Sequence, residues 1–265
     1  MFRRRIELKT AEQLALMRRA GAVVAATLQA VREAVAPGVT TGELDALARD
    51  TIAAHGATSN FLGYGAGGQA PGFPGVICTS VNEEVVHGIP GSRVLREGDL
   101  LSVDCGAVVE GWHGDAATTI GVGQVAPDAA RLVEVTEQAL AAGIAAGSLG
   151  GRVGDISAAI EQSVRAAGRY ELTDGFTGHG IGTAMHQAPD VPNVGRAGKG
   201  PRIVPGLVLA IEPMVTMGSA DNRTLEDGWT VVSADASWAA HCEHSVTWTE
   251  DGPWILTAPG GLTAQ

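Results

Sequence analysis

The chain has 265 residues, 45% of them hydrophobic, which is enough apolar material for one large domain with a packed core. A formal net charge of −11 argues against nucleic acid as a partner, and we find no apolar run that predicts a membrane span or a secretory signal. The cysteines, Cys78, Cys105 and Cys242, form no CxxC pair, which disfavours zinc fingers and disulfides. We therefore expect a cytoplasmic globular protein with buried thiols.

The first half of the chain predicts a helix followed by a β-hairpin. Residues 41–57 begin with a helix start signal, carry apolar residues at helical spacing and end near Gly56. Residues 102–120 contain two β-branched runs around a turn at Glu110-Gly111. With that two-residue loop, Asp104 lies opposite Ala117, and Asp115 becomes its diagonal neighbour on the same face of the sheet. Two aspartates in adjacent strands indicate a shared cation.

The second half opens in a similar way, with a predicted helix over residues 153–169 that ends near Gly168. The glycine-rich stretch TGHGIGTAMH (177–186) follows, and it suits a loop or strand end where bare backbone approaches another group closely. Its histidines, His179 and His186, are equally compatible with a buried structural role and with a ligand role on this motif alone.

Two further acids stand in strand-like runs. Glu212 lies in LVLAIEPMV, where Pro213 suits a strand end, and Glu243 lies in HCEHSVTWT. A single glutamate in a strand-like run is more often solvent-exposed than a metal ligand. Four acidic residues in such runs, together with His179, instead favour a ligand role. The nearby His241 and His244 could be either partners of the Glu243 strand or solvent-exposed imidazoles, and the sequence does not distinguish the two roles.

The two halves repeat each other. EGDLLSVDCG (97–106) and PGLVLAIEPM (205–214) each place a carboxylate, Asp104 or Glu212, six residues after a glycine. The two helical stretches precede these strands at similar offsets. We therefore predict a single catalytic domain, residues 1–265, made of two pseudo-twofold-related halves, roughly 10–125 and 126–252. Chance likeness between alanine-rich helices is the alternative for the helices alone.

The candidate ligands form a mostly oxygen set with one nitrogen, namely Asp104, Asp115, His179, Glu212 and Glu243. Such a set suits two divalent ions bridged by carboxylates and a water, and it disfavours a closed structural zinc site because it holds no thiolate. Two cations acidify the bridging water and polarise a carbonyl, which is the chemistry of amide hydrolysis.

The motifs that carry these residues resemble those of type I methionine aminopeptidases, members of the M24 metallopeptidases. The resemblance covers residues 10–256 and rests on TGHGIGTAMH, SVDCG with GDAA, IEPM, CEHS and TSVNEEVVHGIP (79–90). It implies the α+β, duplicated pita-bread (creatinase/aminopeptidase) fold, with antiparallel sheets and outer helices. It also implies removal of the initiator methionine from nascent polypeptides with a small second residue, by attack of a metal-bridged water on the first peptide bond.

The resemblance also implies residue roles. Asp104 would bind one metal, His179 and Glu212 the other, and Asp115 and Glu243 would bridge. Glu212 would shuttle the proton of the attacking water, while His87 would contact the scissile amide nitrogen and His186 the carbonyl oxygen. Without the resemblance, His87 would be read as a loop histidine that caps nearby backbone. The expected methionine pocket has apolar walls from Tyr64, Phe73, Cys78, Met185 and Trp229.

The implied cofactors are two divalent ions (Co, Mn, Fe, Zn or Ni). The implied partners are methionyl peptides and nascent chains at the ribosome, and the chain is expected to be a monomer. The chain departs from the family pattern at Met185, where phenylalanine is frequent, at His241, where glutamine is frequent, and in an insertion between Tyr64 and Phe73. The rival activities are an X-Pro dipeptidase or aminopeptidase P, which share fold and ligands. A non-catalytic peptide-binding relative is the rival from another class.

Overall fold

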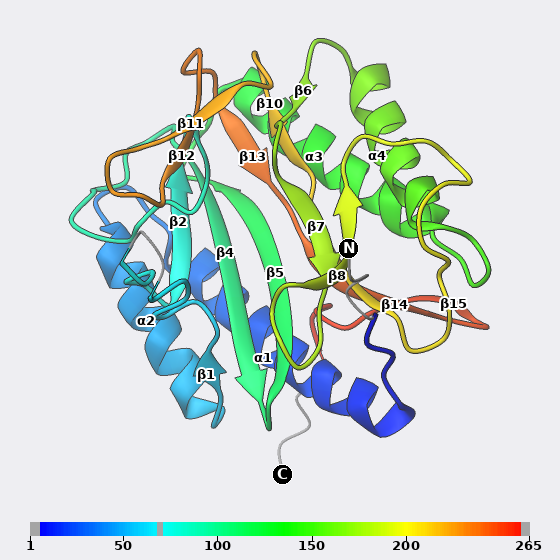
Figure 1. Cartoon of the computed structure of the whole chain (residues 1–265). Coiled ribbons are helices and arrows are strands. Elements are labelled where there is room, and N and C mark those ends of the chain that lie inside the picture. The colour runs from blue at the N-terminus through cyan, green and yellow to red at the C-terminus, as the bar shows by residue number, and fades with distance from the viewer. Residues whose placement is uncertain (1–5, 68–70, 261–265) are drawn as a thin grey trace.

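The described residues of the computed structural model, 6–67 and 71–260, form four helices and fifteen strands (Figure 1). The helices are α1 (Ala11–Ala34), α2 (Thr41–Ala54), α3 (Pro127–Ala146) and α4 (Val153–Ala167). The first eight strands are β1 (Thr58–Ser59), β2 (Ile77–Val81), β3 (Glu84–Val86), β4 (Leu100–Val109), β5 (Trp112–Gly121), β6 (Glu171–Leu172), β7 (Thr177–Gly180) and β8 (Gln187–Pro192). The others are β9 (Val208–Ile211), β10 (Met214–Thr216), β11 (Asn222–Thr224), β12 (Val231–Ser233), β13 (Ala239–His241), β14 (His244–Thr249) and β15 (Gly252–Ile255). Residues 68–70 of the predicted insertion lie outside the described residues.

Local sequence signals fix where the two N-terminal helices begin. Thr10 and Gln13 form a capping box at the start of α1, and Thr40 and Glu43 form another at the start of α2. Both boxes satisfy backbone N–H groups that have no partner inside the helix. The predicted helices are confirmed at α2 and α4, and each ends slightly earlier than the glycine chosen from the sequence.

The strands form antiparallel sheets. One has the order β1-β4-β2 with β5 paired to β4, and a second has the order β15-β14-β9-β7-β8. Two three-stranded sheets complete the arrangement, β13-β10-β6 and β11-β12-β3. The mixture of antiparallel sheets and helices matches the predicted fold class.

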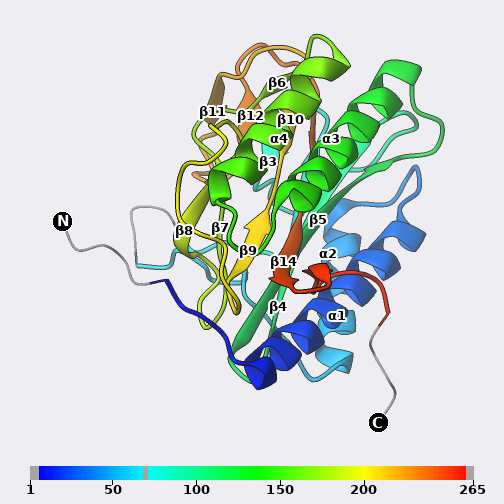
Figure 2. The ribbon, with the colours of Figure 1, turned by 90° about the vertical axis from the view of Figure 1, so that its right-hand side faces the viewer.

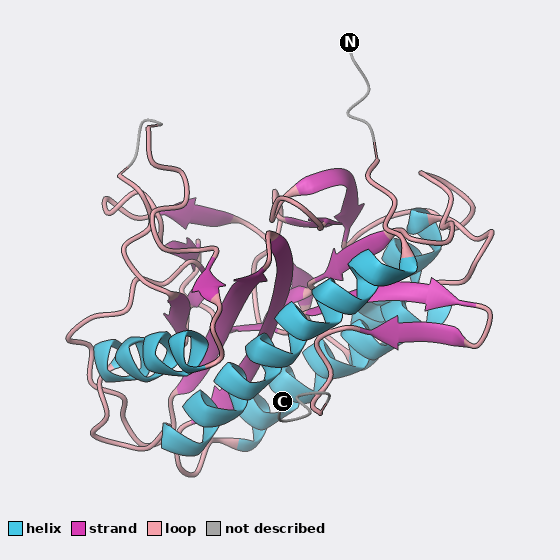
Figure 3. Cartoon of the chain, turned by 90° about the horizontal axis from the view of Figure 1, so that it is seen from below, coloured by secondary structure: helices cyan, strands magenta, loops and turns pink. Residues whose placement is uncertain are grey.

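The helices gather on one side of the sheets and leave the other side open (Figures 2 and 3). Helix α1 contacts β4 and β5, while α3 and α4 contact each other. This arrangement covers one face of the central strands with apolar side chains. The side chains that point to the other face are free to build a site.

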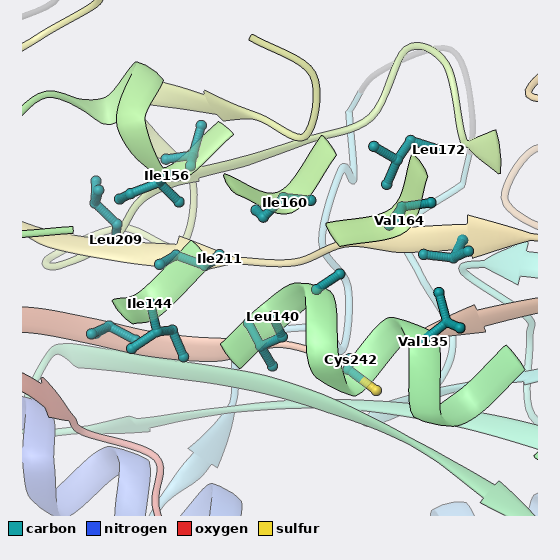
Figure 4. Packing of buried hydrophobic residues seen from close by; sticks show 14 of the residues in the cluster. Val135, Leu140, Ile144, Ile156, Ile160, Val164, Leu172, Leu209, Ile211 and Cys242 are labelled. Carbon is teal, nitrogen blue, oxygen red and sulfur yellow. The ribbon is translucent and has the colours of Figure 1, made fainter. Parts of the chain in front are cut away.

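Two apolar clusters lie between the helices and the sheets. In one, Val23 and Val24 of α1 pack with Val103 and Cys105 of β4. The other cluster packs the apolar faces of α3 and α4 on strands of the second half, and Figure 4 shows Cys242 at its edge, near Leu140 and Val135. The three cysteines are free and buried, in agreement with the sequence analysis.

Helix α1 corrects one expectation. It is the one helix among the described residues that is long and apolar enough, by length and composition, to cross a membrane, although no such run was predicted. Its buried residues include Met17, Ala20, Val24 and Val31. Because α1 packs on β4 and β5, the protein core accounts for these apolar residues.

Candidate active site

The β4–β5 hairpin places two aspartates side by side. Glu110 and Gly111 form its turn with φ angles of 50° and 83°, the left-handed values that a type I′ turn requires. Asp104 pairs with Ala117 across the hairpin, as the two-residue loop predicts. Asp115 is therefore the diagonal same-face neighbour of Asp104, and the predicted register is confirmed.

Both glutamates lie where paired strands are interrupted. β9 ends at Ile211 and β10 begins at Met214, while β13 ends at His241 and β14 begins at His244. These four residues pair across the two ladders, Ile211 with His244 and Met214 with His241. Glu212-Pro213 therefore faces Cys242-Glu243 in a shared gap. Because the ladder is interrupted there, the two carboxylates can turn toward the hairpin.

A pair of backbone hydrogen bonds links this gap to the hairpin. The Glu243 amide donates to the Ala117 carbonyl at 2.9 Å, and the Ala117 amide donates back to the Glu243 carbonyl at 3.4 Å. On either side of this pair, Ser245 bonds to the backbone of Asp115 and Thr119 bonds to the backbone of His241. The seam between the two sheets is thus fixed at the level of the acidic residues.

Strand β7 carries His179 in the glycine-rich stretch. A Cβ atom at Gly178 would lie 2.4 Å from the Ala210 carbonyl oxygen, and one at Gly180 would lie 2.3 Å from that of Ala188. Only glycine permits such contacts, so the predicted close approach of backbone is confirmed. The His179 Nδ1 atom lies 3.0 Å from the Gly180 carbonyl oxygen, to which an Nδ1–H can donate. That bond leaves the Nε2 lone pair facing Glu212 Oε1, 3.5 Å away.

The assembled side chains fit divalent cations. Ligand atoms of Asp115, His179 and Glu243 lie within 4.8 Å of one another, and so do those of Glu212, His241 and Glu243. One oxygen each of Asp104, Asp115 and Glu243 is buried without a hydrogen-bond partner. Buried polar atoms normally have partners, and a cation would supply them here. The donor set is mostly oxygen, as predicted.

The raised pKa values of the buried carboxylates also favour a cation site. Burial raises the pKa of Asp104 to about 7. The pKa values of Asp115, Glu212 and Glu243 are also raised well above their usual range, first by burial and then by neighbouring carboxylates. Without a counter-charge these groups oppose each other's ionisation, whereas divalent cations would favour the charged forms of all four.

His241 is a site residue whose place the sequence left open. It is 2% exposed, its Nε2 atom has no hydrogen-bond partner, and that atom lies 3.7 Å from Glu212 Oε2 and 4.0 Å from Glu243 Oε2. His244 points elsewhere, with Nδ1 2.8 Å from Thr257 Oγ1. The spacing of two between His241 and Glu243 was the available signal for a shared face.

A cavity of about 150 Å³ is lined partly by the acidic residues and partly by apolar side chains. Every side chain predicted for the methionine pocket lines it, namely Tyr64, Phe73, Cys78, Met185 and Trp229. The sequence analysis missed Phe61, which packs edge-on against Phe73, and Phe176, which packs edge-on against His87. The aromatic and sulfur-containing walls of this cavity suit an apolar side chain.

The other two histidines predicted for the site, His87 and His186, also line this cavity. His87 has a φ of 60° and lies edge-on to Trp229, with ring centroids 6.2 Å apart. Burial lowers its pKa to about 4, so the ring is neutral near pH 7. The centroids of the His186 and His179 rings lie 4.2 Å apart, and the Tyr64 hydroxyl oxygen lies 2.6 Å from His186 Nδ1. The cavity thus joins apolar walls, neutral imidazoles and the carboxylates in one place.

Comparisons with known proteins identify the family to which the chain belongs. The family described as Metallopeptidase family M24 matches residues 15–250. Methionine aminopeptidase 1 of Mycobacterium tuberculosis is 50% identical over 261 residues, which cover 96% of each chain. The methionine aminopeptidase of Clostridium perfringens is 47% identical over 252 residues, or 95% of this chain and 98% of that one.

Solved structures confirm the fold. The methionine aminopeptidase of Rickettsia prowazekii superposes with a TM-score of 0.91 and 37% identity, over 96% of this chain and all of that one (100%). The prolidase of Pyrococcus furiosus has a TM-score of 0.76 and 18% identity, over 96% of this chain and 66% of that one. The second likeness shows the fold alone. Together these relatives confirm the predicted pita-bread architecture.

Proposed function

The chain belongs to metallopeptidase family M24, among the methionine aminopeptidases, and from this premise we propose that it removes initiator methionine from nascent polypeptides with a small second residue. One observation carries the proposal, the convergence of orphaned, buried carboxylate oxygens beside a cavity with aromatic and sulfur-containing walls. The proposed substrate places its first side chain in that cavity and its first peptide bond beside the acids.

The proposed metal ligands are those of the sequence analysis. Asp104 would hold one ion, His179 and Glu212 would hold the other, and Asp115 and Glu243 would be shared between them. When bound, two divalent cations supply Lewis-acid polarisation of a carbonyl and acidify water near neutral pH. The oxygen-rich donor set accepts manganese, iron, cobalt, nickel or zinc.

The protein side chains have separate tasks in this proposal. Glu212 accepts a proton from the attacking water and returns it to the leaving amine. The neutral ring of His87 hydrogen-bonds the scissile amide nitrogen. His186 donates a hydrogen bond to the carbonyl oxygen as negative charge develops there. The cavity walls hold the methionine side chain, so the peptide bond is oriented before reaction.

We also propose that the chain is a cytoplasmic monomer that acts on methionyl peptides and on nascent chains at the ribosome. The net charge of −11 makes direct binding to ribosomal RNA unfavourable, so the nascent peptide itself is the expected contact. Analytical ultracentrifugation of the purified chain measures the oligomeric state directly.

The decisive experiment is hydrolysis of a peptide panel by metal-free protein with one cation added back at a time. We expect Met-Ala-Ser to be cleaved far faster than Leu-Ala-Ser, because the proposed pocket is expected to select the methionine side chain. Ala-Pro peptides test the X-Pro dipeptidase alternative. Equal cleavage of the methionyl and leucyl peptides would contradict methionine selectivity, and no cleavage with any cation would contradict the proposed reaction.

A further inference from the structure

The hydroxyl of Tyr64 makes a short contact with a histidine from a distant part of the chain. The oxygen lies 2.6 Å from His186 Nδ1, and the two rings meet at 62° with centroids 5.3 Å apart. This distance is that of a strong hydrogen bond. The sequence predicted Tyr64 only as an apolar wall of the methionine pocket. That role does not explain the contact made by its hydroxyl.

The backbone around Tyr64 holds the phenol in place. The Tyr64 amide donates to the Phe61 carbonyl at 2.8 Å, and the Phe73 amide donates to the Tyr64 carbonyl at 2.9 Å. These two bonds fix the residue on both sides, although its side chain lies at the rim of the cavity. The contact with His186 therefore comes from an ordered segment.

The direction of this hydrogen bond decides what His186 can do. A neutral imidazole carries one N–H, and the partner of one ring nitrogen determines which nitrogen holds the proton. The reference pKa of a phenol is about 10, and that of an imidazole is about 6.5. At neutral pH the phenol thus keeps its proton and can donate, while the ring can accept at Nδ1.

The neighbouring histidine has the opposite arrangement. His179 Nδ1 faces a carbonyl oxygen, that of Gly180, which can only accept, so the His179 proton lies on Nδ1 and its Nε2 has a free lone pair. His186 Nδ1 faces a hydroxyl, which can donate. Two rings with centroids 4.2 Å apart can thus hold opposite tautomers, one suited to a cation and one to a developing oxyanion.

We propose that Tyr64 is a positioning residue whose hydroxyl holds His186 as its Nε2–H tautomer, so that this ring donates to the carbonyl oxygen of the substrate. The proposal rests on the role proposed above for His186. In the reverse arrangement, with the proton on Nδ1, Nε2 would present a lone pair to the oxyanion and repel it.

The tautomer itself can be measured without any reaction. Long-range ¹H–¹⁵N spectra of ¹⁵N-histidine-labelled protein at pH 7.5 distinguish Nδ1–H from Nε2–H, and His186→Asn identifies the signal. We expect His186 to be Nε2–H in the wild type and a mixture of both tautomers in Tyr64→Phe, which keeps the ring. Tyr170→Phe, the matched control at the only other tyrosine, should leave the signal unchanged. An Nδ1–H pattern in the wild type, or an unaltered pattern in Tyr64→Phe, overturns the proposal.

A double-mutant cycle then tests the consequence for catalysis. Tyr64→Phe should lower kcat for Met-Ala-Ser about tenfold, equivalent to about 1.4 kcal/mol, and change KM less than about twofold. In a His186→Ala background the same change should cost almost nothing, because Tyr64 acts through the ring. Losses that multiply instead would overturn the proposal. A fully active His186→Ala would refute the role of His186 proposed above, while the tautomer measurement would still report on Tyr64 alone.

Discussion

The backbones of Ala117 and Glu243 are hydrogen-bonded to each other across two different sheets, at 2.9 Å in one direction and 3.4 Å in the other. Ala117 is also the partner of Asp104 within the hairpin. A glutamate far along the chain is therefore held level with the aspartates, which explains how acids from separate segments share one small volume.

We expect Asp104→Asn to abolish turnover even when metal is supplied. The amide keeps the shape of the side chain but removes the charge that holds a cation. Metal content by plasma mass spectrometry should fall together with activity. Glu97→Gln, which alters an exposed carboxylate bonded to the Gln124 amide, is the matched control and should retain both. Near-normal turnover by Asp104→Asn would exclude this residue as a ligand.

The metal-free protein should lose stability as pH rises. The pKa of Asp104 is about 7 in the folded chain against about 3.9 unfolded, so folding favours the protonated form. The resulting stability is fully present below about pH 4 and is lost as pH rises to about 7 and beyond. Thermal melts of metal-free wild type and Asp104→Asn should diverge over this window, with the variant melting higher at pH 8. Identical pH profiles would contradict the raised pKa.

Divalent metal should reverse this loss. A cation that binds only the folded chain stabilises it by about 2.7 kcal/mol at 100 times its Kd. Because the carboxylates must be ionised to bind, the rise in Tm on adding Mn²⁺ should be larger at pH 8 than at pH 5. Differential scanning calorimetry with Mn²⁺, and with Mg²⁺ for comparison, measures this. A metal-induced shift that is the same at both pH values would argue against a carboxylate site.

Replacing His87 should damage catalysis and spare the metal. His87 has a φ of 60°, and asparagine tolerates this conformation better than alanine, so His87→Asn limits backbone strain. Loss of a group that acts on the substrate should lower kcat/KM about 100-fold or more. His55→Asn changes an exposed histidine at the end of α2 and should be silent. If His87→Asn loses metal, the residue serves the metal centre instead of the substrate.

His241 should matter for metal retention. Its Nε2 faces two proposed ligands, Glu212 and Glu243, and has no other partner. We expect His241→Ala to weaken cation binding about 10-fold, within the range for residues that support metal ligands, and His241→Gln to weaken it less, because glutamine keeps a polar group there. Competition with a chelating dye measures the affinities. Unchanged affinity in His241→Ala would show that this ring serves only packing.

The site was predictable wherever short-range rules fix geometry. The two-residue turn at Glu110-Gly111 determines the register that brings Asp104 and Asp115 together. The spacing of two was a signal that His241 and Glu243 share a face, but the approach of His241 to Glu212 could not be deduced. It depends on the gap between β13 and β14, which in turn depends on pairing with a distant strand. Phe61 was missed for a similar reason, since the path of its loop decides that it faces the cavity.

The internal repeat of two similar halves remains a prediction. Gly98 and Gly206, each six residues before a proposed ligand, both adopt left-handed φ values, 91° and 82°. The strands that follow them, β4 and β9, lie beneath different pairs of helices. Glycines at matching positions of two segments are a repeat signal that a single sequence can reveal.

The position of Glu243 in the last interrupted pair of strands has a consequence for biosynthesis. A polypeptide stalled on the ribosome before this residue contains the whole β4–β5 hairpin, but it lacks both the seam partner of Ala117 and one of the proposed metal ligands. Such a fragment would expose the unmatched edge of β5 to proteases and chaperones. Only chains translated past Glu243 can therefore complete the proposed metal site.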